Sequence, residues 1–320
     1  MRVFIAGGTG VIGQHLIPML TSAGHEVTAT TRSPGKAGML RSLGATPVTM
    51  DGLDADAVLA AVRRAGPEVI VHQMTALSSL RNFRKFDREF AVTNQLRTAG
   101  TDNLLAAARA VGAGRFIAQS YTGWPNIREG GPVKTEEDPL DPHPPAAMAE
   151  GLRAIRHVEQ AVSGFPGGVV LRYGGLYGPG ASEQMLGPVR KRQLPIVGDG
   201  AGVWSFCHVE DAAAATAAAI TRGAPGIYNI VDDDPAPVAE WLPFLAACLG
   251  AKPPLRVPAW LGRLLGGEAV VFMMTESRGS SNEKAKRGLG WSLRYPSWRD
   301  GFPAWAGATP VPKAARDRAA

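Results

Sequence analysis

Apolar positions follow strand-like and helical spacings in turn along the first two thirds of the chain. A short apolar run before Gly7 and a β-branched run at 26–33 predict strands, and apolar positions at helical spacing predict a helix at 11–23. The same patterns predict further strands at 47–50, 69–72, 115–119 and 168–172, and helices at 37–43, 55–65, 90–111 and 147–162. This alternation indicates an α/β fold, with a doubly wound parallel sheet covered by helices on both faces.

The last third of the chain lacks this alternation. Its helical segments, at 235–249, 258–265 and 283–289, are joined by prolines and glycines. We therefore expect a smaller, mainly helical substrate lobe beside the sheet domain. The expected bounds are 1–172 and 203–231 for the sheet domain, 173–202 and 232–306 for the substrate lobe, and 307–320 for a disordered tail.

A long segment without regular structure is expected at 124–145. It contains six prolines, the pair Gly130-Gly131 and five acidic residues, which excludes a helix and disfavours a strand. Because the helix and strand that follow belong to the same sheet, we expect an ordered loop or lid. A structureless linker is the alternative.

Glycines at positions 7, 10 and 13 join the first predicted strand to the first predicted helix. A side chain at Gly7 or Gly10 would keep backbone N–H groups away from a diphosphate, and Gly13 permits close packing of helix on strand. We interpret this unit as the dinucleotide-binding turn of a Rossmann-type sheet. The alternative is a tight turn that binds nothing.

The end of the second predicted strand indicates which dinucleotide binds. Arg32 stands where an acidic side chain would hold the ribose 2′-hydroxyl of NAD. A guanidinium suits the 2′-phosphate of NADP instead, and Ser33 and Lys36 add donors nearby. We therefore expect NADP(H) as the cofactor, the alternative being that Arg32 is a solvated loop cation.

Composition excludes several other classes of protein. The chain has 320 residues, 45% of them hydrophobic, and no apolar stretch reaches the roughly 18 to 20 residues of a membrane span. Cys207 and Cys248 lack metal or disulfide spacing, so we expect a reducing cytoplasm and no metal. The net charge is +6, but the basic run at 190–192 has no interleaved aromatics, so a small-molecule substrate is expected rather than nucleic acid. A homodimer is left open.

Several short motifs occur in a characteristic order along the chain. They are residues 7–13 (GGTGVIG), Asp51, Asn94, 100–105 (GTDNLL), 171–180, 197–200, 206–212, 228–229 and 289–291. Together they resemble the extended short-chain dehydrogenase/reductase superfamily, of the NAD-dependent epimerase/dehydratase type. The resemblance implies that Asp51 binds the adenine amino group, that Asn94 orders the helix behind the active site, and that Ser120 hydrogen-bonds the reacting carbonyl. Each could instead be a local cap or a satisfied hydroxyl.

The glycine motif, the residues at the strand ends and the family resemblance together predict which residues contact the cofactor. They are Gly7, Thr9, Gly10, Val11, Ile12, Gly13, Arg32, Ser33, Lys36, Asp51, Gly52, Thr75, Asn94 and Tyr173.

The chain departs from this superfamily at the catalytic pair. The family carries Tyr-x-x-x-Lys on the helix after the lid, with the lysine four residues before a glutamate. Taking Glu159 as that glutamate places Ile155 at the lysine position and Gly151 at the tyrosine position. No tyrosine or lysine occurs between 147 and 163, so both catalytic side chains are absent.

Without that tyrosine, a carbonyl that accepts a hydride needs its proton from elsewhere. Ser120 and Thr122 are expected to donate hydrogen bonds, Tyr177 is the preferred substitute acid, and Tyr121 should point away from Ser120 because of strand alternation. Water is a further source. So is an acidic hydroxyl on the substrate, as in the similar angucyclinone-type polyketide ketoreductases. An apolar pocket for a polycyclic substrate could draw on Trp124, Met148, Trp204, Phe206, Met273 and Met274, although such side chains more often belong to the core.

The sequence thus predicts an NADP(H)-dependent oxidoreductase that reduces a carbonyl or an activated double bond of a small substrate, with aromatic polyketides among the options. A non-catalytic NAD(P)-sensing protein is the first alternative. A sugar-nucleotide epimerase or dehydratase ranks last, because it would need the absent tyrosine as its base.

Overall fold

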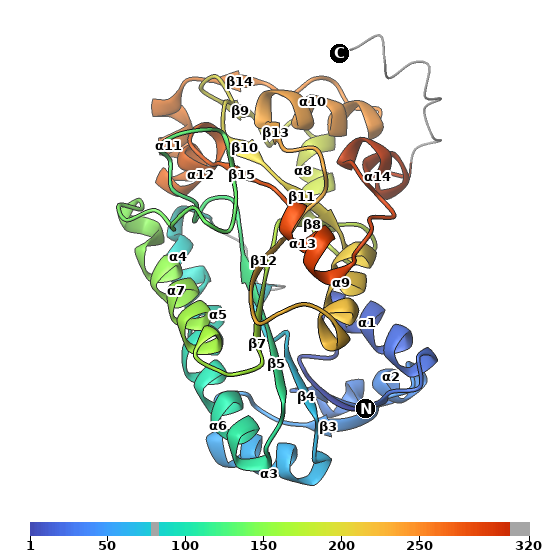
Figure 1. Ribbon diagram of the computed structural model, residues 1–320. Helices are drawn as coiled ribbons and strands as arrows, with labels where there is room; N and C mark the ends of the chain where they lie inside the picture. The colour runs from blue at the N-terminus through green and yellow to red at the C-terminus, as the bar shows by residue number, and fades with distance from the viewer. Residues whose placement is uncertain (78–82, 308–320) are drawn as a thin grey trace.

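The central feature of the fold is a parallel seven-stranded sheet, seen in a computed structural model that describes residues 1–77 and 83–307 (Figure 1). The strand order is β3-β2-β1-β4-β5-β7-β12, so the direction of winding reverses between β1 and β4. The strands are β1 (Arg2–Ala6), β2 (Glu26–Thr31), β3 (Thr46–Thr49), β4 (Val69–His72), β5 (Arg115–Tyr121), β7 (Gly168–Tyr173) and β12 (Gly226–Ile230). The predicted doubly wound α/β fold is confirmed. Ligands of such sheets bind beyond the carboxyl ends of the strands, at the point of reversal.

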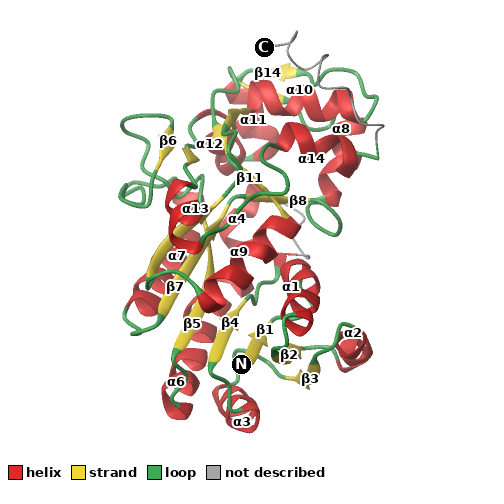
Figure 2. Cartoon of the chain, turned by 45° about the vertical axis from the view of Figure 1, so that its right-hand side comes forward, coloured by secondary structure: helices red, strands yellow, loops and turns green. Residues whose placement is uncertain are grey.

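Helices cover both faces of this sheet (Figure 2). One face packs against α1 (Val11–Ser22), α2 (Ala37–Ser42) and α9 (Val209–Thr221), and the other against α3 (Ala55–Ala65), α6 (Thr101–Val111) and α7 (Ala149–Ser163). Alternate residues of β1 supply the two cores, with Val3 and Ile5 on the first face and Phe4 and Ala6 on the second. The central strands β1, β4 and β7 are buried almost throughout and are mostly apolar, whereas the edge strand β3 is partly exposed and β2 is rich in threonine.

The helix predicted at 90–111 is built from three consecutive segments. They are α5 (Ala91–Gln95), a π-helical turn η4 (Leu96–Gly100) and α6. Ahead of them lie the 3₁₀ turn η3 (Phe83–Lys85) and the short α4 (Phe86–Glu89). A π-helical turn inside a longer helix is uncommon and frequently marks a functional site.

A second lobe lies beyond the carboxyl ends of β5 and β7, at the top of Figure 1. Its helices are α8 (Leu186–Arg190), α10 (Val238–Cys248), α11 (Ala259–Gly266), α12 (Glu268–Thr275) and α14 (Trp298–Trp305). The fully buried Trp241 and Trp298 lie at the centre of its core. Helix α13 (Glu283–Leu289) packs instead on β12 and α9, so the chain returns to the sheet before its last described helix.

Four pairs of short strands lie outside the main sheet. They are β6 (Val133–Lys134) with β15 (Gly279–Ser280), β8 (Gly175–Tyr177) with β11 (Phe206–His208), β9 (Ile196–Val197) with β14 (Arg256–Val257), and β10 (Val203–Trp204) with β13 (Ala236–Pro237). The expected loop at 124–145 contributes only β6 to them. Residues 308–320, most of the expected tail, lie outside the described residues. Within the described chain, no helix combines the length and apolarity needed to cross a bilayer.

Candidate active site

Three glycines shape the turn between β1 and α1. Gly7 has φ +93°, and a Cβ there would lie 2.8 Å from the backbone carbonyl of Gln73. A Cβ at Gly13 would lie 2.4 Å from the carbonyl oxygen of Gly8, so helix and turn touch at that point. Gly10 is exposed and begins α1 without a capping side chain, which leaves the first N–H groups of the helix available to an anion. The turn therefore fits the diphosphate of a dinucleotide.

The residues expected around the adenosine end lie at the ends of β2 and β3. Arg32, Ser33 and Lys36 are exposed after β2, and no ion pair joins Arg32 to any residue of 1–77 or 83–307. Asp51 is exposed, and its carboxylate accepts the N–H of Leu53 at 3.0 Å, which is the local turn considered as its alternative role. The cluster of exposed donors after β2 is compatible with a phosphate.

Two buried amide oxygens lack hydrogen-bond partners near the carboxyl end of β4. They are Oε1 of Gln73 and Oδ1 of Asn94. The other side of the Gln73 amide is fixed, because its Nε2 donates to the hydroxyl of Tyr173 at 3.0 Å, and that hydroxyl also meets Oγ1 of Thr216 at 2.7 Å. Unsatisfied buried acceptors are costly, and they fit a ligand that carries N–H or O–H donors, as a nicotinamide nucleoside does.

Ser120 lies in a buried polar network rather than open to a substrate. Its hydroxyl donates to Oε1 of Glu159 at 2.7 Å, and Arg172 forms a two-pronged pair with the same carboxylate at 2.8 and 2.7 Å. All three side chains are buried. The placement differs from the expectation that Ser120 holds the reacting carbonyl, because strand alternation turns its hydroxyl toward α7, where Glu159 takes its only proton.

Thr122 and Tyr177 also lie in enclosed surroundings. Thr122 is hydrogen-bonded to Ser280 at 2.6 Å and to Asn126 at 3.2 Å, which joins the start of the lid to β15. Tyr177 belongs to the core of the second lobe, where its ring packs against aromatic neighbours and its hydroxyl lacks a partner. Burial, reinforced by the nearby carboxylate of Asp232, raises the pKa of Tyr177 far above that of an ordinary phenol. This geometry disfavours Tyr177 as the substitute acid.

The side chain that does reach a cavity at the end of β5 is Tyr121. The cavity is lined by Tyr121, Thr122, Gly123, Trp124, Val203, Trp204, Ser205, Met273 and Ser277. Tyr121 is half-buried there, and burial raises its pKa to about 12. Tyr121 packs against the cluster that contains Leu152 and Ile155 of α7, and Ser120 donates to Glu159 of the same helix. The sequence held no indication of this packing.

Three of the six side chains proposed for an apolar pocket line this cavity, namely Trp124, Trp204 and Met273. The other three, Met148, Phe206 and Met274, are buried in hydrophobic clusters. The pocket is therefore aromatic in character but smaller than the full set would have made it.

The position that the family gives to tyrosine is a buried glycine in this chain. A Cβ at Gly151 would meet the Phe86 ring, the Asp87 carboxylate and the Trp124 indole at 3.4 to 3.5 Å. The Asp87 carboxylate accepts the N–H groups of Gly151 at 3.0 Å and Glu150 at 3.1 Å and so caps the start of α7. These are ordinary van der Waals distances, so an alanine fits at this buried position, and a tyrosine ring would have to displace one of these neighbours.

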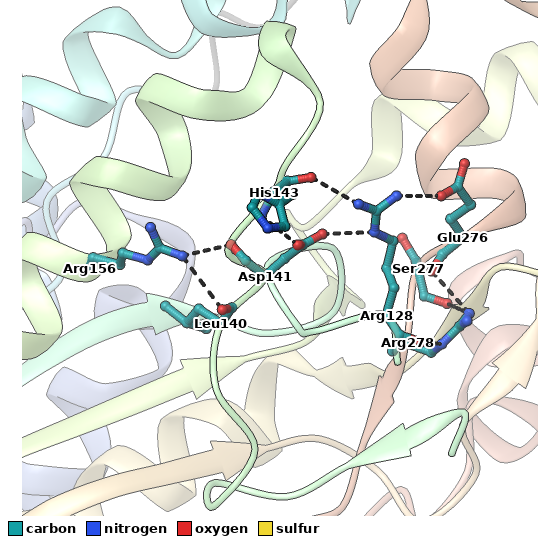
Figure 3. A network of polar contacts seen from close by, with 8 residues as sticks. All are labelled: Arg128, Leu140, Asp141, His143, Arg156, Glu276, Ser277 and Arg278. Atoms are coloured by element: carbon teal, nitrogen blue, oxygen red, sulfur yellow. Dashed lines mark hydrogen bonds and ion pairs between the residues drawn. The ribbon is translucent and has the colours of Figure 1, made fainter. Parts of the chain in front are cut away.

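The loop at 124–145 is held in place by a polar network (Figure 3). Arg128 pairs with Asp141 at 2.9 Å and with Glu276, at the end of α12, at 2.8 Å. Arg156 of α7 donates to the backbone carbonyl of Asp141 at 2.6 Å. The loop is therefore ordered and tied both to the sheet domain and to the second lobe.

The order of the strands, the glycine turn and the cavity at the end of β5 are together typical of an α/β enzyme that uses a nucleotide cofactor. Comparison with known proteins identifies the family. The chain belongs to the NAD dependent epimerase/dehydratase family, which matches residues 3–231. The predicted membership of the extended short-chain dehydrogenase/reductases is thereby confirmed.

Two relatives of this chain are named as reductases. The chain is 44% identical to a 3-diazoavenalumate denitrifying reductase from a Streptomyces species, over 94% of this chain and 99% of that protein. It is 31% identical to a 2-alkyl-3-oxoalkanoate reductase from Stenotrophomonas maltophilia, over 78% and 76%. The structure of human epimerase family protein SDR39U1 with NADPH aligns with a TM-score of 0.73 at 21% identity, covering 97% of this chain and all of that one.

These likenesses confirm an oxidoreductase that uses a nicotinamide cofactor to reduce a small molecule. They favour this function over the non-catalytic alternative. Sugar-nucleotide epimerases are more distant, as shown by UDP-glucose 4-epimerase from Thermotoga maritima, at 22% identity.

Proposed function

We propose that the chain is an NADPH-dependent reductase of an aromatic substrate that carries a diazo group. The observation that carries this proposal is that glycine stands at position 151, packed against Phe86, Asp87 and Trp124, and that the buried Ile155 stands at the lysine position. An enzyme built in this way suits a reduction that needs no proton from α7. The 44% identity to a reductase named for a diazo substrate and for denitrification points to the same chemistry.

The choice between substrates depends on what becomes of the added electron pair. When bound, the nicotinamide ring supplies a hydride. A ketone that accepts a hydride becomes an alkoxide and then requires a proton. An aromatic diazo group that accepts one leaves as dinitrogen, so that a C–H bond replaces the C–N bond and NADPH becomes NADP⁺. The second reaction balances without an acidic side chain.

The protein's contribution would be binding and orientation. Trp124, Trp204 and Met273 line the cavity together with Thr122, Ser205 and Ser277. The cavity has room for about one water molecule, so a flat ring would enter only if some of these side chains moved apart. Holding the ring close to the cofactor in the right orientation can lower the activation free energy by about 7 to 11 kcal/mol.

Reduction of a ketone is the second candidate function. It is favoured by the presence of the Tyr121 hydroxyl at the same cavity and by the likeness to the 2-alkyl-3-oxoalkanoate reductase. In that case Tyr121 would donate a hydrogen bond to the carbonyl oxygen.

Substrate panels with deuterated NADPH test the proposal. With 2-diazophenol we expect NADPH oxidation matched by an equal amount of released dinitrogen, and one deuterium on the ring carbon of the phenol formed. Oxidation of NADPH with acetophenone or 3-oxoalkanoates, and none above the protein-free rate with 2-diazophenol, would establish the second candidate instead.

A matched pair of glycine variants separates this activity from background reduction. Gly7→Ala places a Cβ 2.8 Å from the Gln73 backbone at a positive φ, so cofactor binding and turnover should fall together. Gly38→Ala, where a Cβ meets nothing within 4 Å, should behave as the wild type does.

A further inference from the structure

Exposed apolar side chains gather on and just before α11 of the second lobe. Ten large apolar side chains are exposed in the described chain, and four of them fall between residues 255 and 265, namely Leu255, Trp260, Leu264 and Leu265. Trp260 is the most exposed of the four, at 66%. Large apolar side chains that cluster on a surface mark a site for a partner or a membrane, whereas scattered ones need no explanation.

The packing of α11 explains why its apolar side chains point outward. Gly262 lies against β9, since a Cβ there would stand 2.5 Å from a methyl carbon of Val197. Trp260 and Leu264 are four residues apart and share the side of the helix that faces away from this contact. Arg263, beside them, is also exposed. The helix therefore presents an apolar ridge with a cation at its flank.

The segments around this ridge are basic. Residues 186–198 and 249–267 contain no aspartate or glutamate and six cations, namely Arg190, Lys191, Arg192, Lys252, Arg256 and Arg263. All of them except the half-buried Arg192 are exposed, and within 1–77 and 83–307 none of the six forms an ion pair. The acids Asp199 and Glu268 directly follow the two segments, and two acids against six cations leave a net charge of +4.

Backbone contacts hold the two basic segments side by side. Strands β9 and β14 pair in parallel, with Ile196 opposite Arg256. The guanidinium of Arg192 donates to the backbone carbonyl of Pro253 at 2.9 Å. The run at 190–192 and helix α11 thus belong to one part of the second lobe, above the sheet in Figure 1. We call the four apolar side chains and the six cations together the α11 surface.

We propose that the α11 surface docks on an anionic lipid bilayer, with Trp260 and Leu264 in the interfacial layer and the cations beside headgroup phosphates. Basic side chains around the apolar face of a helix are the composition that anionic membranes bind. Tryptophan favours the interface, where its ring is in apolar surroundings and its N–H is wet. A bilayer also yields around an outward-pointing ridge, whereas a protein partner must offer a matching groove. This inference does not rest on the proposed function.

Flotation with lipid vesicles tests the proposal on the full chain. The wild type should bind vesicles made of equal parts of phosphatidylcholine and phosphatidylglycerol, and should bind vesicles of phosphatidylcholine alone at least about 10-fold more weakly. Added salt should weaken the binding to the mixed vesicles, because it screens the cations from the headgroups. Absence of binding to the mixed vesicles at low salt, or equal binding to both kinds of vesicle, would overturn the proposal.

One pair of variants measures the apolar contribution. Trp260→Ala should weaken binding to the mixed vesicles about 10-fold, because the indole no longer enters the interfacial layer. Val92→Ala removes an exposed apolar side chain from α5 of the sheet domain and should bind as the wild type does. Equal binding by Trp260→Ala and the wild type would overturn the proposal.

A second pair measures the contribution of charge. The double variant Lys252→Gln/Arg263→Gln should weaken binding about 30-fold, roughly fivefold for each cation near an anionic surface. Arg63→Gln/Arg64→Gln removes two exposed arginines from the end of α3 and should bind as the wild type does. All substituted side chains are exposed, so every variant should keep the wild-type melting temperature. Equal weakening in both double variants would overturn the proposal.

Two other occupants of the α11 surface give different results. If a second copy of this chain covers it, sedimentation shows a dimer that Trp260→Ala dissociates, and the wild type does not float with vesicles. If an acidic protein covers it, poly-glutamate binds the wild type and not Lys252→Gln/Arg263→Gln, again without vesicle binding. Either result would overturn the proposal.

Discussion

We predict that the charge at the end of β2 decides which of the two nicotinamide dinucleotides binds. Arg32 is exposed and lacks an ion pair within the described chain, so its guanidinium is available to a 2′-phosphate. Arg32→Ala should reduce the preference for NADPH over NADH by about 1.5 to 3 kcal/mol, roughly 10- to 100-fold. Calorimetric dissociation constants for both cofactors measure this directly.

The control for this prediction is Arg41→Ala, which removes an exposed arginine from the neighbouring helix α2. It should leave the preference intact. If the wild type bound NADH and NADPH equally well, Arg32 would have no part in cofactor choice.

Single residues also show where reasoning from sequence stops. The shape of the glycine turn and the absence of a tyrosine at 151 could be predicted, because each depends on local spacing, whereas the role of Arg32 stays a prediction. The role of Ser120 could not be predicted, since it depends on Glu159, a residue 39 positions away that takes its proton. Nor could the turn η4, because helical periodicity does not reveal a π-helical turn.

Among the elements, the loop at 124–145 depends most on one side chain. Arg128 joins Asp141 of the loop to Glu276 of α12 (Figure 3). Arg128→Gln removes both ion pairs, and since the arginine is one-third exposed we expect a loss of about 1 kcal/mol. The backbone amides of Ile127 and Asp141 should then exchange about fivefold faster with deuterium, and the KM for substrate should rise while NADPH affinity stays unchanged.

An exposed pair on α7 supplies the matched control for that experiment. Arg153→Gln breaks the contact of Arg153 with Glu150, both of which are exposed, and should leave exchange in the loop unaltered. Wild-type exchange rates in Arg128→Gln would show that backbone bonds alone hold the loop, such as that from Asp141 N–H to the carbonyl of Pro125 at 2.8 Å.

Element order was predictable wherever the hydrophobic period was clear. Six strands of the sheet and α1, α3 and α7 follow directly from apolar spacing and from turn residues, whereas no strand was predicted at 226–230, where β12 lies. The second lobe was less accessible, because α12 and α14 lie in segments where aromatic and glycine residues obscure the period. The packing of α13 on β12 required knowledge of long-range contacts that no local pattern contains.

For the molecule as a whole, buried histidine links stability to pH. Nδ1 of His72 accepts the N–H of Met74 at 3.2 Å, and Nε2 meets the carbonyl of Leu96 at 3.2 Å, so the ring is satisfied in its neutral form. Burial lowers the pKa of His72 from 6.5 to about 4. Below pH 6.5 the unfolded chain therefore takes up a proton that the folded chain refuses, and stability falls until about pH 4.

Urea unfolding at pH 7 and pH 5 measures this contribution. From the two pKa values, His72 should account for about 2 kcal/mol of the stability lost between these pH values. Between pH 7 and pH 5, the free energy of unfolding of His72→Gln should therefore fall by about 2 kcal/mol less than that of the wild type. His143→Gln, at an exposed position, should show the same fall as the wild type. An equal fall in the free energy of unfolding of His72→Gln and the wild type would contradict the prediction.

The filled space at Gly151 restricts how such an enzyme can change. A tyrosine ring introduced there would have to displace the Phe86 ring or the Trp124 indole, both of which belong to the same hydrophobic cluster. Installing the family's acid in this chain would therefore require replacement of a neighbouring ring as well as of Gly151. Substrate choice can change more easily than the source of the proton, because it also depends on side chains at the cavity, such as Val203 and Ser277, that lie outside this cluster.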